Sequence, residues 1–323
     1  MRNLPSSPPA ARLTRHPDDI TAVDTEYLRP GFAAAHIVRH AGRAALVDVG
    51  SNGSVPSLLA ALRELAIPPE AVDYLLLTHV HLDHAGGAGA LMQALPNAVA
   101  VLHPRGAPHM IDPQKLVAGA KVVYGEERFR SLYGDIVPIA AERVHVSRDG
   151  ERLSLGGREF AILHTPGHAL HHHVFVDLAH GNIFTGDTFG ISYRELDSAS
   201  GTFITPTTTP TQFDPEQLCA SIDRMLAYAP KAMYLTHYSR VTDAARLGDS
   251  LKSQIREFVR IAKDACSHSD PHEAMREGMW TLWRELAHRQ GCPLSDEQLR
   301  EFLAVDLDLN SQGLAHWLGR SNR

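Results

Sequence analysis

Four potential metal ligands stand close together in one short segment of the chain. They are His79, His81, Asp83 and His84, and they directly follow an apolar run at residues 74–77 that is typical of a buried strand. His79 and His81 are two residues apart, so their side chains point the same way on an extended segment. Asp83 and His84 can face a second point if the chain turns into a helix there. This geometry suits two adjacent metal ions.

Three further polar residues stand where other short apolar runs end. His168, Asp187 and His237 each follow such a run, which is the usual position of a binding site in an α/β sheet. Taken singly, each is more often a residue with a satisfied structural role than a metal ligand. Seven such residues, in a chain with 20 histidines, favour a metal centre. Five imidazoles and two carboxylates are nitrogen and oxygen ligands that suit zinc, iron or manganese.

The combined pattern resembles the metallo-β-lactamase-fold superfamily of metallohydrolases. The resemblance extends from about residue 23 to residue 237 and includes the Ala-Leu-Val-Asp-Val-Gly segment at residues 45–50, the strand that precedes the metal loop in that superfamily. It implies an α/β (α+β) fold, a four-layer αββα sandwich with a C-terminal helical appendage. The ligand set is similar to that of glyoxalase II and thioesterase-like members, and other segments resemble a bacterial and archaeal branch.

The resemblance also implies which residue binds which ion. One ion would be bound by His79, His81 and His168, and the second by Asp83, His84 and His237, with Asp187 bridging the two. The expected cofactors are therefore two divalent ions per chain, zinc first, with iron or manganese as alternatives. Two such ions about 4 Å apart would share a water whose pKa falls towards about 7.

We therefore expect a metal-dependent hydrolase in which a bridging hydroxide attacks the carbonyl carbon of a small ester, thioester or lactone. Asp83, Asp187 and His172 are the residues to which we assign catalytic roles. Two alternatives stay open. An iron-dependent dioxygenase of the persulfide type uses only the first three ligands, and a non-catalytic di-iron protein would bind or sense oxygen.

Outside the ligand set, His172 and Asp48 are the main candidates. His172 stands four residues after His168, and glyoxalase II-like members have a similar second histidine that contacts substrate or orients a ligand. A structural strand histidine explains the same spacing equally well. Asp48 is expected to support the metal loop. Tyr193 and Tyr238 could stabilise an oxyanion, although a tyrosine beside a site more often serves packing.

The elements that must position these residues follow from the pattern along the chain. We expect a loose N-terminal arm at residues 1–19, a catalytic domain at 20–242 and a helical C-terminal region at 243–323. Asp270 and Ser295 each precede a helix-start pattern with a glutamate or glutamine three residues on. Strands are expected at residues 44–49, 74–77, 98–102, 160–163, 174–178 and 183–185, and helices at 91–95 and 116–124.

Composition excludes several other functions. The formal net charge is −6 and basic residues do not cluster, so we expect no nucleic-acid partner. We also expect no membrane partner, because no apolar run reaches the roughly 20 residues of a membrane span. The absence of a secretory signal and the three scattered cysteines lead us to expect a cytoplasmic protein. The expected partners are a small-molecule substrate and a second copy of the chain, held through the C-terminal helices.

Overall fold

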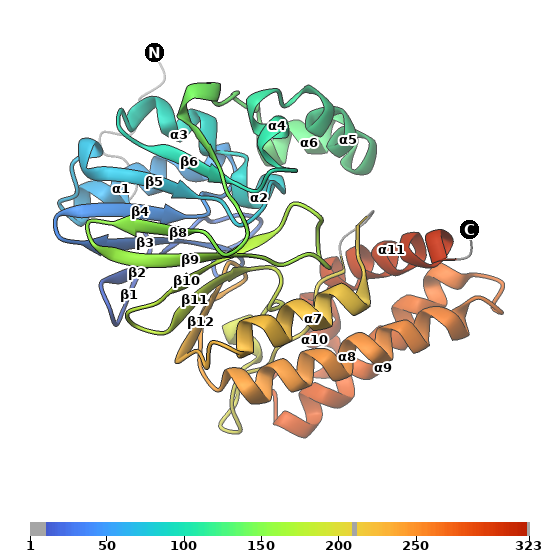
Figure 1. The fold of residues 1–323 in the computed structure, drawn as a ribbon. Coiled ribbons are helices and arrows are strands. Elements are labelled where there is room, and N and C mark those ends of the chain that lie inside the picture. Colours follow the sequence, from blue (N-terminus) through green and yellow to red (C-terminus); the bar gives the residue numbers. More distant parts are fainter. Residues whose placement is uncertain (1–10, 209–211, 322–323) are drawn as a thin grey trace, which may run out of the picture. The chain divides into compact units, whose positions relative to one another are not determined.

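The computed structural model describes residues 11–208 and 212–321, and the chain divides into two compact units. Unit 1 comprises Met1–His164 and His173–His180, and unit 2 comprises Thr165–His172 and Gly181–Arg323. Figure 1 labels most of the helices and strands of both units. In the described ranges, no helix combines the length and apolar character that crossing a membrane requires.

Unit 1 is built on a mixed seven-stranded sheet whose strands lie in chain order. They are β1 (Leu13–His16), β2 (Ile20–Asp24), β3 (Ala34–His40), β4 (Arg43–Val47), β5 (Val72–Leu76), β6 (Val99–Leu102) and β7 (Val144–Val146). Strands β1 to β4 pair antiparallel, whereas β4 to β7 pair parallel. The same unit holds the antiparallel strands β8 (Arg152–Leu155), β9 (Arg158–His164) and β10 (His173–Asp177).

The described part of unit 1 also contains six α-helices, of which α1 and α3 pack on the sheet. They are α1 (Val55–Glu64), α2 (Leu82–Ala85), α3 (Ala88–Ala94), α4 (Ala107–Ile111), α5 (Gln114–Tyr124) and α6 (Glu126–Tyr133). The apolar faces of α1 and α3, with Leu58 and Leu91, join Leu46 and Leu75 of the strands in one core (Figure 1). Because β4 and β5 are parallel and pair Val47 with Leu76, the segments that follow them lie side by side.

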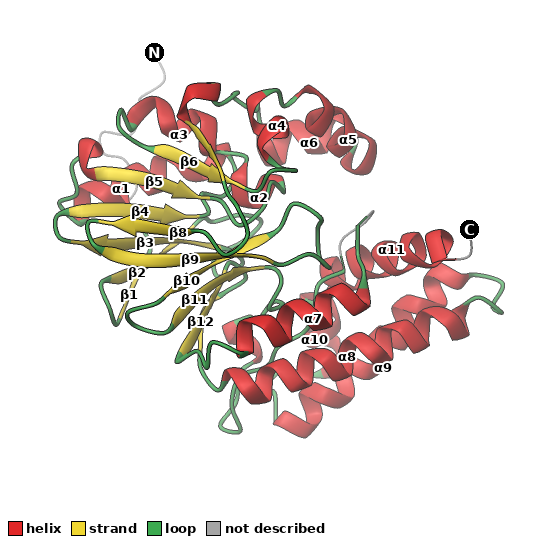
Figure 2. Cartoon of the chain, viewed as in Figure 1, coloured by secondary structure: helices red, strands yellow, loops and turns green. Residues whose placement is uncertain are grey.

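Unit 2 combines a small sheet with long helices. Its strands are β11 (Asn182–Gly186), which pairs parallel with β12 (Ala232–Leu235), and β13 (Ser239–Val241), which pairs antiparallel with β12. Its helices are α7 (Pro215–Leu226), α8 (Ala244–Ala265), α9 (Pro271–Gln290), α10 (Asp296–Phe302) and α11 (Ala304–Ser321). Helix α7 packs on α8, α8 on α9, and α9 on α11 (Figure 2).

Most elements expected from the sequence are confirmed. The six predicted strands match β4, β5, β6, β9, β10 and β11 to within two residues at each end. Helix α9 begins as predicted, since the Asp270 side chain accepts a hydrogen bond from the Glu273 amide. Helix α10 begins with the reciprocal hydrogen bonds of Ser295 and Gln298.

The predicted loose arm at residues 1–19 is wrong for its later part. Residues 1–10 lie outside the described ranges, but Leu13–His16 forms strand β1 along the edge of the sheet. This strand is held by backbone hydrogen bonds to β2 and buries none of its side chains fully, so its sequence carries no alternation of apolar residues. The predicted boundary at residue 242 lies just before α8, away from the division between the compact units, and stays a prediction.

Candidate metal centre

Unit 1 carries four of the predicted ligands on the segment that links β5 to α2. His79 and His81 lie on its extended part, with His79 Nε2 2.8 Å from His81 Nδ1. The chain then turns into α2 at Leu82, and Asp83 Oδ2 lies 3.7 Å from His84 Nε2. The predicted turn into a helix is therefore present, and it separates the four side chains into two pairs.

Asp48 supports this loop, as the sequence predicts. It directly follows β4 and is 1 % exposed. Its carboxylate accepts hydrogen bonds from the Thr78 amide (2.8 Å), from the Thr78 hydroxyl (2.9 and 3.0 Å to its two oxygens) and from His84 Nδ1 (2.9 Å). One buried carboxylate thus fixes both the start of the loop and the orientation of the His84 ring.

Unit 2 carries the other three predicted ligands, grouped around one carboxylate. Asp187 follows β11, and its two oxygens face different imidazoles: Oδ2 lies 3.4 Å from His168 Nε2, and Oδ1 lies 3.8 Å from His237 Nε2. All three residues are buried. A carboxylate placed in this way between two imidazoles is suited to bridge two ions.

The residues present fit a divalent metal in both units. His84 donates through Nδ1 to Asp48, and His168 donates through Nδ1 to the Thr207 carbonyl (3.3 Å), which leaves Nε2 of each ring with a lone pair for a metal. Two ligands of a tetrahedral ion with bonds of about 2.05 Å lie about 3.3 Å apart. The 3.4 Å between His168 and Asp187 agrees with that spacing. Histidine and aspartate residues of both units thus belong to the groups that could hold a metal ion.

His172 is fully buried, and both of its ring nitrogens are engaged. The Asp187 amide donates to Nε2 (3.2 Å), and Nδ1 lies 2.9 Å from the Thr165 hydroxyl and 3.0 Å from the Thr188 hydroxyl. An Nε2 that accepts from the amide requires the proton on Nδ1. This arrangement favours the orienting role for His172, through the backbone of Asp187, over contact with substrate.

Sequence reasoning missed His173, which holds the metal loop through its backbone and its ring. His173 is completely buried; its amide donates to the Thr78 carbonyl (2.9 Å), and its Nε2 donates to the Leu77 carbonyl (2.7 Å). Ser147 donates to its Nδ1 (2.9 Å). Burial lowers the pKa of His173 to about 3, so the ring stays neutral and keeps this donor pattern. The run of three histidines at 171–173 gave no signal that separated this role from those of its neighbours.

Tyr193, the other candidate, is engaged elsewhere. The Tyr193 hydroxyl donates to Asp306 (3.2 Å), which does not support a role in stabilising an oxyanion.

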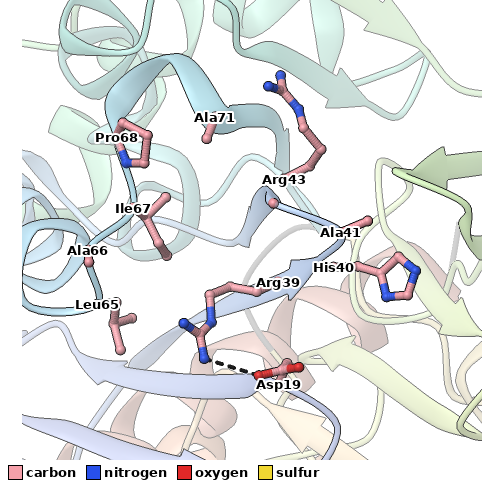
Figure 3. A pocket seen from close by; sticks show the side chains of 11 residues that line it. Asp19, Arg39, His40, Ala41, Arg43, Leu65, Ala66, Ile67, Pro68 and Ala71 are labelled. Carbon is pink, nitrogen blue, oxygen red and sulfur yellow. Dashed lines mark hydrogen bonds and ion pairs between the residues drawn. The ribbon is translucent and has the colours of Figure 1, made fainter.

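Unit 1 also contains a pocket of about 290 Å³ near the β3–β4 turn, where the Arg39 guanidinium points to Asp19 (Figure 3). Arg43, which lines the same pocket, forms an ion pair with Asp73, so its charge is balanced. Among the described residues that line the pocket, none is a predicted metal ligand.

Comparison with known proteins places these residues in a family. Residues 28–237, which contain all seven predicted ligands, match the family model described as the metallo-beta-lactamase superfamily. A metallo-beta-lactamase fold-containing protein of Sulfurisphaera tokodaii is 26% identical over 242 residues, which are 73% of this chain and 84% of that protein. A hydroxyacylglutathione hydrolase of Xanthomonas axonopodis pv. citri is 34% identical over 182 residues, 56% of this chain. This chain spans about half the length of that hydrolase (52%).

A solved structure extends the match in fold to nearly the whole chain. The crystal structure of a metallo-beta-lactamase family protein from Thermus thermophilus aligns with a TM-score of 0.63 at 19% identity, covering 97% of this chain and 94% of that protein. The predicted fold class, an αββα sandwich with C-terminal helices, is confirmed. The chain belongs to the metallo-beta-lactamase superfamily.

Proposed function

We propose that this protein is a hydrolase that uses two divalent metal ions on a small ester, thioester or lactone. The observation that carries the proposal is the position of Asp187, whose two oxygens face His168 and His237 separately. A residue that served a single ion would not need an imidazole on each oxygen. The similarity to a protein named hydroxyacylglutathione hydrolase supports a thioester among these substrates.

In this proposal the seven predicted ligands hold the ions. The first ion would be held by His79, His81 and His168, and the second by Asp83, His84 and His237, with Asp187 as the shared ligand. When bound, two such ions would supply a water of lowered pKa as nucleophile and would polarise the substrate carbonyl group, whose carbon the water attacks. The nitrogen and oxygen donor set suits zinc, iron and manganese alike. Zinc is the first candidate that we would test.

The surrounding residues keep the ligands in the form that binds metal. Asp48 holds the His84 proton on Nδ1, the Thr207 carbonyl does the same for His168, and His172 fixes the backbone amide of Asp187. Each of these contacts restricts a ligand to one orientation before metal binds, which lowers the entropic cost of assembling the centre. The predicted homodimer and cytoplasmic location stay predictions.

The test is a substrate panel on metal-reconstituted protein. Protein reconstituted separately with zinc, manganese and iron is assayed against a thioester, a lactone and a phosphoester, with oxygen uptake followed in parallel. We expect hydrolysis of the thioester or lactone, lost in His237→Ala and kept in His288→Ala, an exposed histidine that pairs with Asp296. Oxygen uptake by the iron form without any hydrolysis would contradict the proposal and support the dioxygenase or oxygen-binding alternatives.

A further inference from the structure

Helix α11 carries two polar side chains and a glycine on a buried face, where an amphipathic helix normally carries apolar residues. Asp306, Asn310 and Gly313 are four and three residues apart, so they lie on the same side of the helix. Asp306 and Asn310 are 7 % and 2 % exposed. A buried polar side chain lowers stability unless it is hydrogen-bonded, so the partners of this face indicate its role.

Asn310 holds the segment that supports His168. The Thr208 amide donates to Asn310 Oδ1 (2.6 Å), and the Thr208 hydroxyl lies 2.9 Å from the same oxygen and 3.0 Å from the Asn310 carbonyl oxygen. A Cβ at Gly313 would overlap the Thr208 carbonyl oxygen, so the backbone of α11 itself approaches this segment. The preceding carbonyl, that of Thr207, accepts from His168 Nδ1 (3.3 Å). Asn310 is therefore linked to one predicted ligand through two adjacent threonines.

Asp306 is linked to another predicted ligand, His237, by a separate route. Its Oδ1 accepts from the hydroxyl of Tyr193 (3.2 Å), which is 1 % exposed. The neighbouring Ser192 amide donates to the His237 carbonyl (2.5 Å), and the Tyr238 amide donates to the Ser192 carbonyl (3.3 Å). The Tyr193 side chain thus anchors a backbone pair that holds His237 in place.

We propose that helix α11 is a positioning element of the metal centre. Asn310 positions His168, which we assign to the first ion. Asp306 positions His237, which we assign to the second ion, through Tyr193. This inference rests on the metal ligation in the proposed function and is independent of the substrate. Because the two ligands belong to different ions, each link should act on its own ion.

The test measures zinc and cobalt binding in three full-length variants. Asn310→Leu removes the side-chain oxygen of the first link, and Tyr193→Phe removes only the hydroxyl of the second. Ser311→Ala is the matched control, because Ser311 is a fully buried residue of α11 whose hydroxyl lies 2.8 Å from His272 Nε2 on α9. Zinc affinities are measured by competition with a chromophoric chelator, and the visible absorption of bound cobalt reports how its ligands are arranged.

We expect each link to affect one of two binding steps. Asn310→Leu should weaken one zinc-binding step about threefold to tenfold and Tyr193→Phe the other, which is less than the usual loss for a partner that touches a metal-bound histidine directly. Both variants should change the cobalt absorption, whereas Ser311→Ala should match the wild-type protein in both measurements.

Three outcomes separate this inference from the proposed function. Unchanged zinc affinity and cobalt absorption in Asn310→Leu and Tyr193→Phe, or equal weakening in Ser311→Ala, would overturn the inference alone. The expected losses of affinity, in a protein that hydrolyses no ester, thioester or lactone, would support the inference and contradict the proposed hydrolase. A wild-type protein that binds neither zinc nor cobalt would overturn both.

Discussion

Replacement of Asp48 by Asn tests how far a buried carboxylate that touches no metal controls the affinity of the centre. The substitution keeps the shape of the side chain and one oxygen that can accept from the Thr78 amide. It replaces the oxygen that accepts from His84 Nδ1 with an NH2 group. An NH2 group cannot accept that proton, so the His84 ring is driven to the tautomer with its proton on Nε2. Nε2 is the nitrogen that we assign to the second ion.

The expected loss follows from the contact that is removed. A hydrogen bond to a charged group contributes about 1.5–3 kcal/mol, and here it restricts the tautomer of one ligand of one ion. We therefore expect the second ion to bind roughly tenfold to a hundredfold more weakly, which matches the usual effect of removing a partner of a metal-bound histidine. The affinity for the first ion should change much less, because Asp48 contacts the loop there only through Thr78.

The assay is a competition titration of the apoprotein with zinc against a chromophoric chelator, fitted to two sites. Asp24→Asn is the matched control, since Asp24 is also a buried aspartate of unit 1 but accepts from the amides of Glu26 (2.8 Å) and Gly31 (2.7 Å). Thermal unfolding shows whether the two variants lose similar stability. Equal weakening of both ions in Asp48→Asn, or the same weakening in Asp24→Asn, would refute the reasoning.

Three further predictions concern the framework around the site. Gly167→Ala should lower both the stability and the metal affinity, because Gly167 has a φ of +130° and an added Cβ would lie 2.3 Å from the backbone of Leu218; calorimetry and metal titration measure the two losses. Burial lowers the pKa of His36 to about 3, so only the unfolded chain gains this proton below about pH 6.5, and the free energy of unfolding should fall by up to about 1.4 kcal/mol per pH unit towards pH 4; urea unfolding of His36→Leu should show a weaker pH dependence. Asp270→Ala should cost about 1 kcal/mol in urea unfolding, through loss of the α9 cap, without changing metal content.

The ligand segment could be predicted from the sequence because its signal is local. The alternation of His79 and His81 after an apolar strand, followed by Asp83 and His84, encodes both the extended part and the turn into α2. The starts of α9 and α10 were predictable for the same reason, since a capping residue and its partner are three residues apart.

The features that sequence reasoning missed depend on contacts between distant segments. Strand β1 exists because it pairs with β2, and a hydrogen bond joins the hydroxyls of Tyr27 and Tyr133, which are 106 residues apart in the chain. The roles of His172 and His173 differ because successive residues face opposite ways: His172 accepts from the Asp187 amide, and His173 donates to the Leu77 carbonyl. A sequence shows that two histidines are adjacent, but their partners are known only once the strands are placed.

The measurement that tests the central claim most directly is the metal content of purified, reconstituted protein and of its Asp187→Ala variant, by plasma mass spectrometry after removal of free metal. We expect two divalent ions per chain in the wild-type protein and at most one in the variant, because both ions lose the carboxylate that we propose they share. Two tightly held ions in Asp187→Ala, or no bound ion in the wild-type protein, would contradict the account.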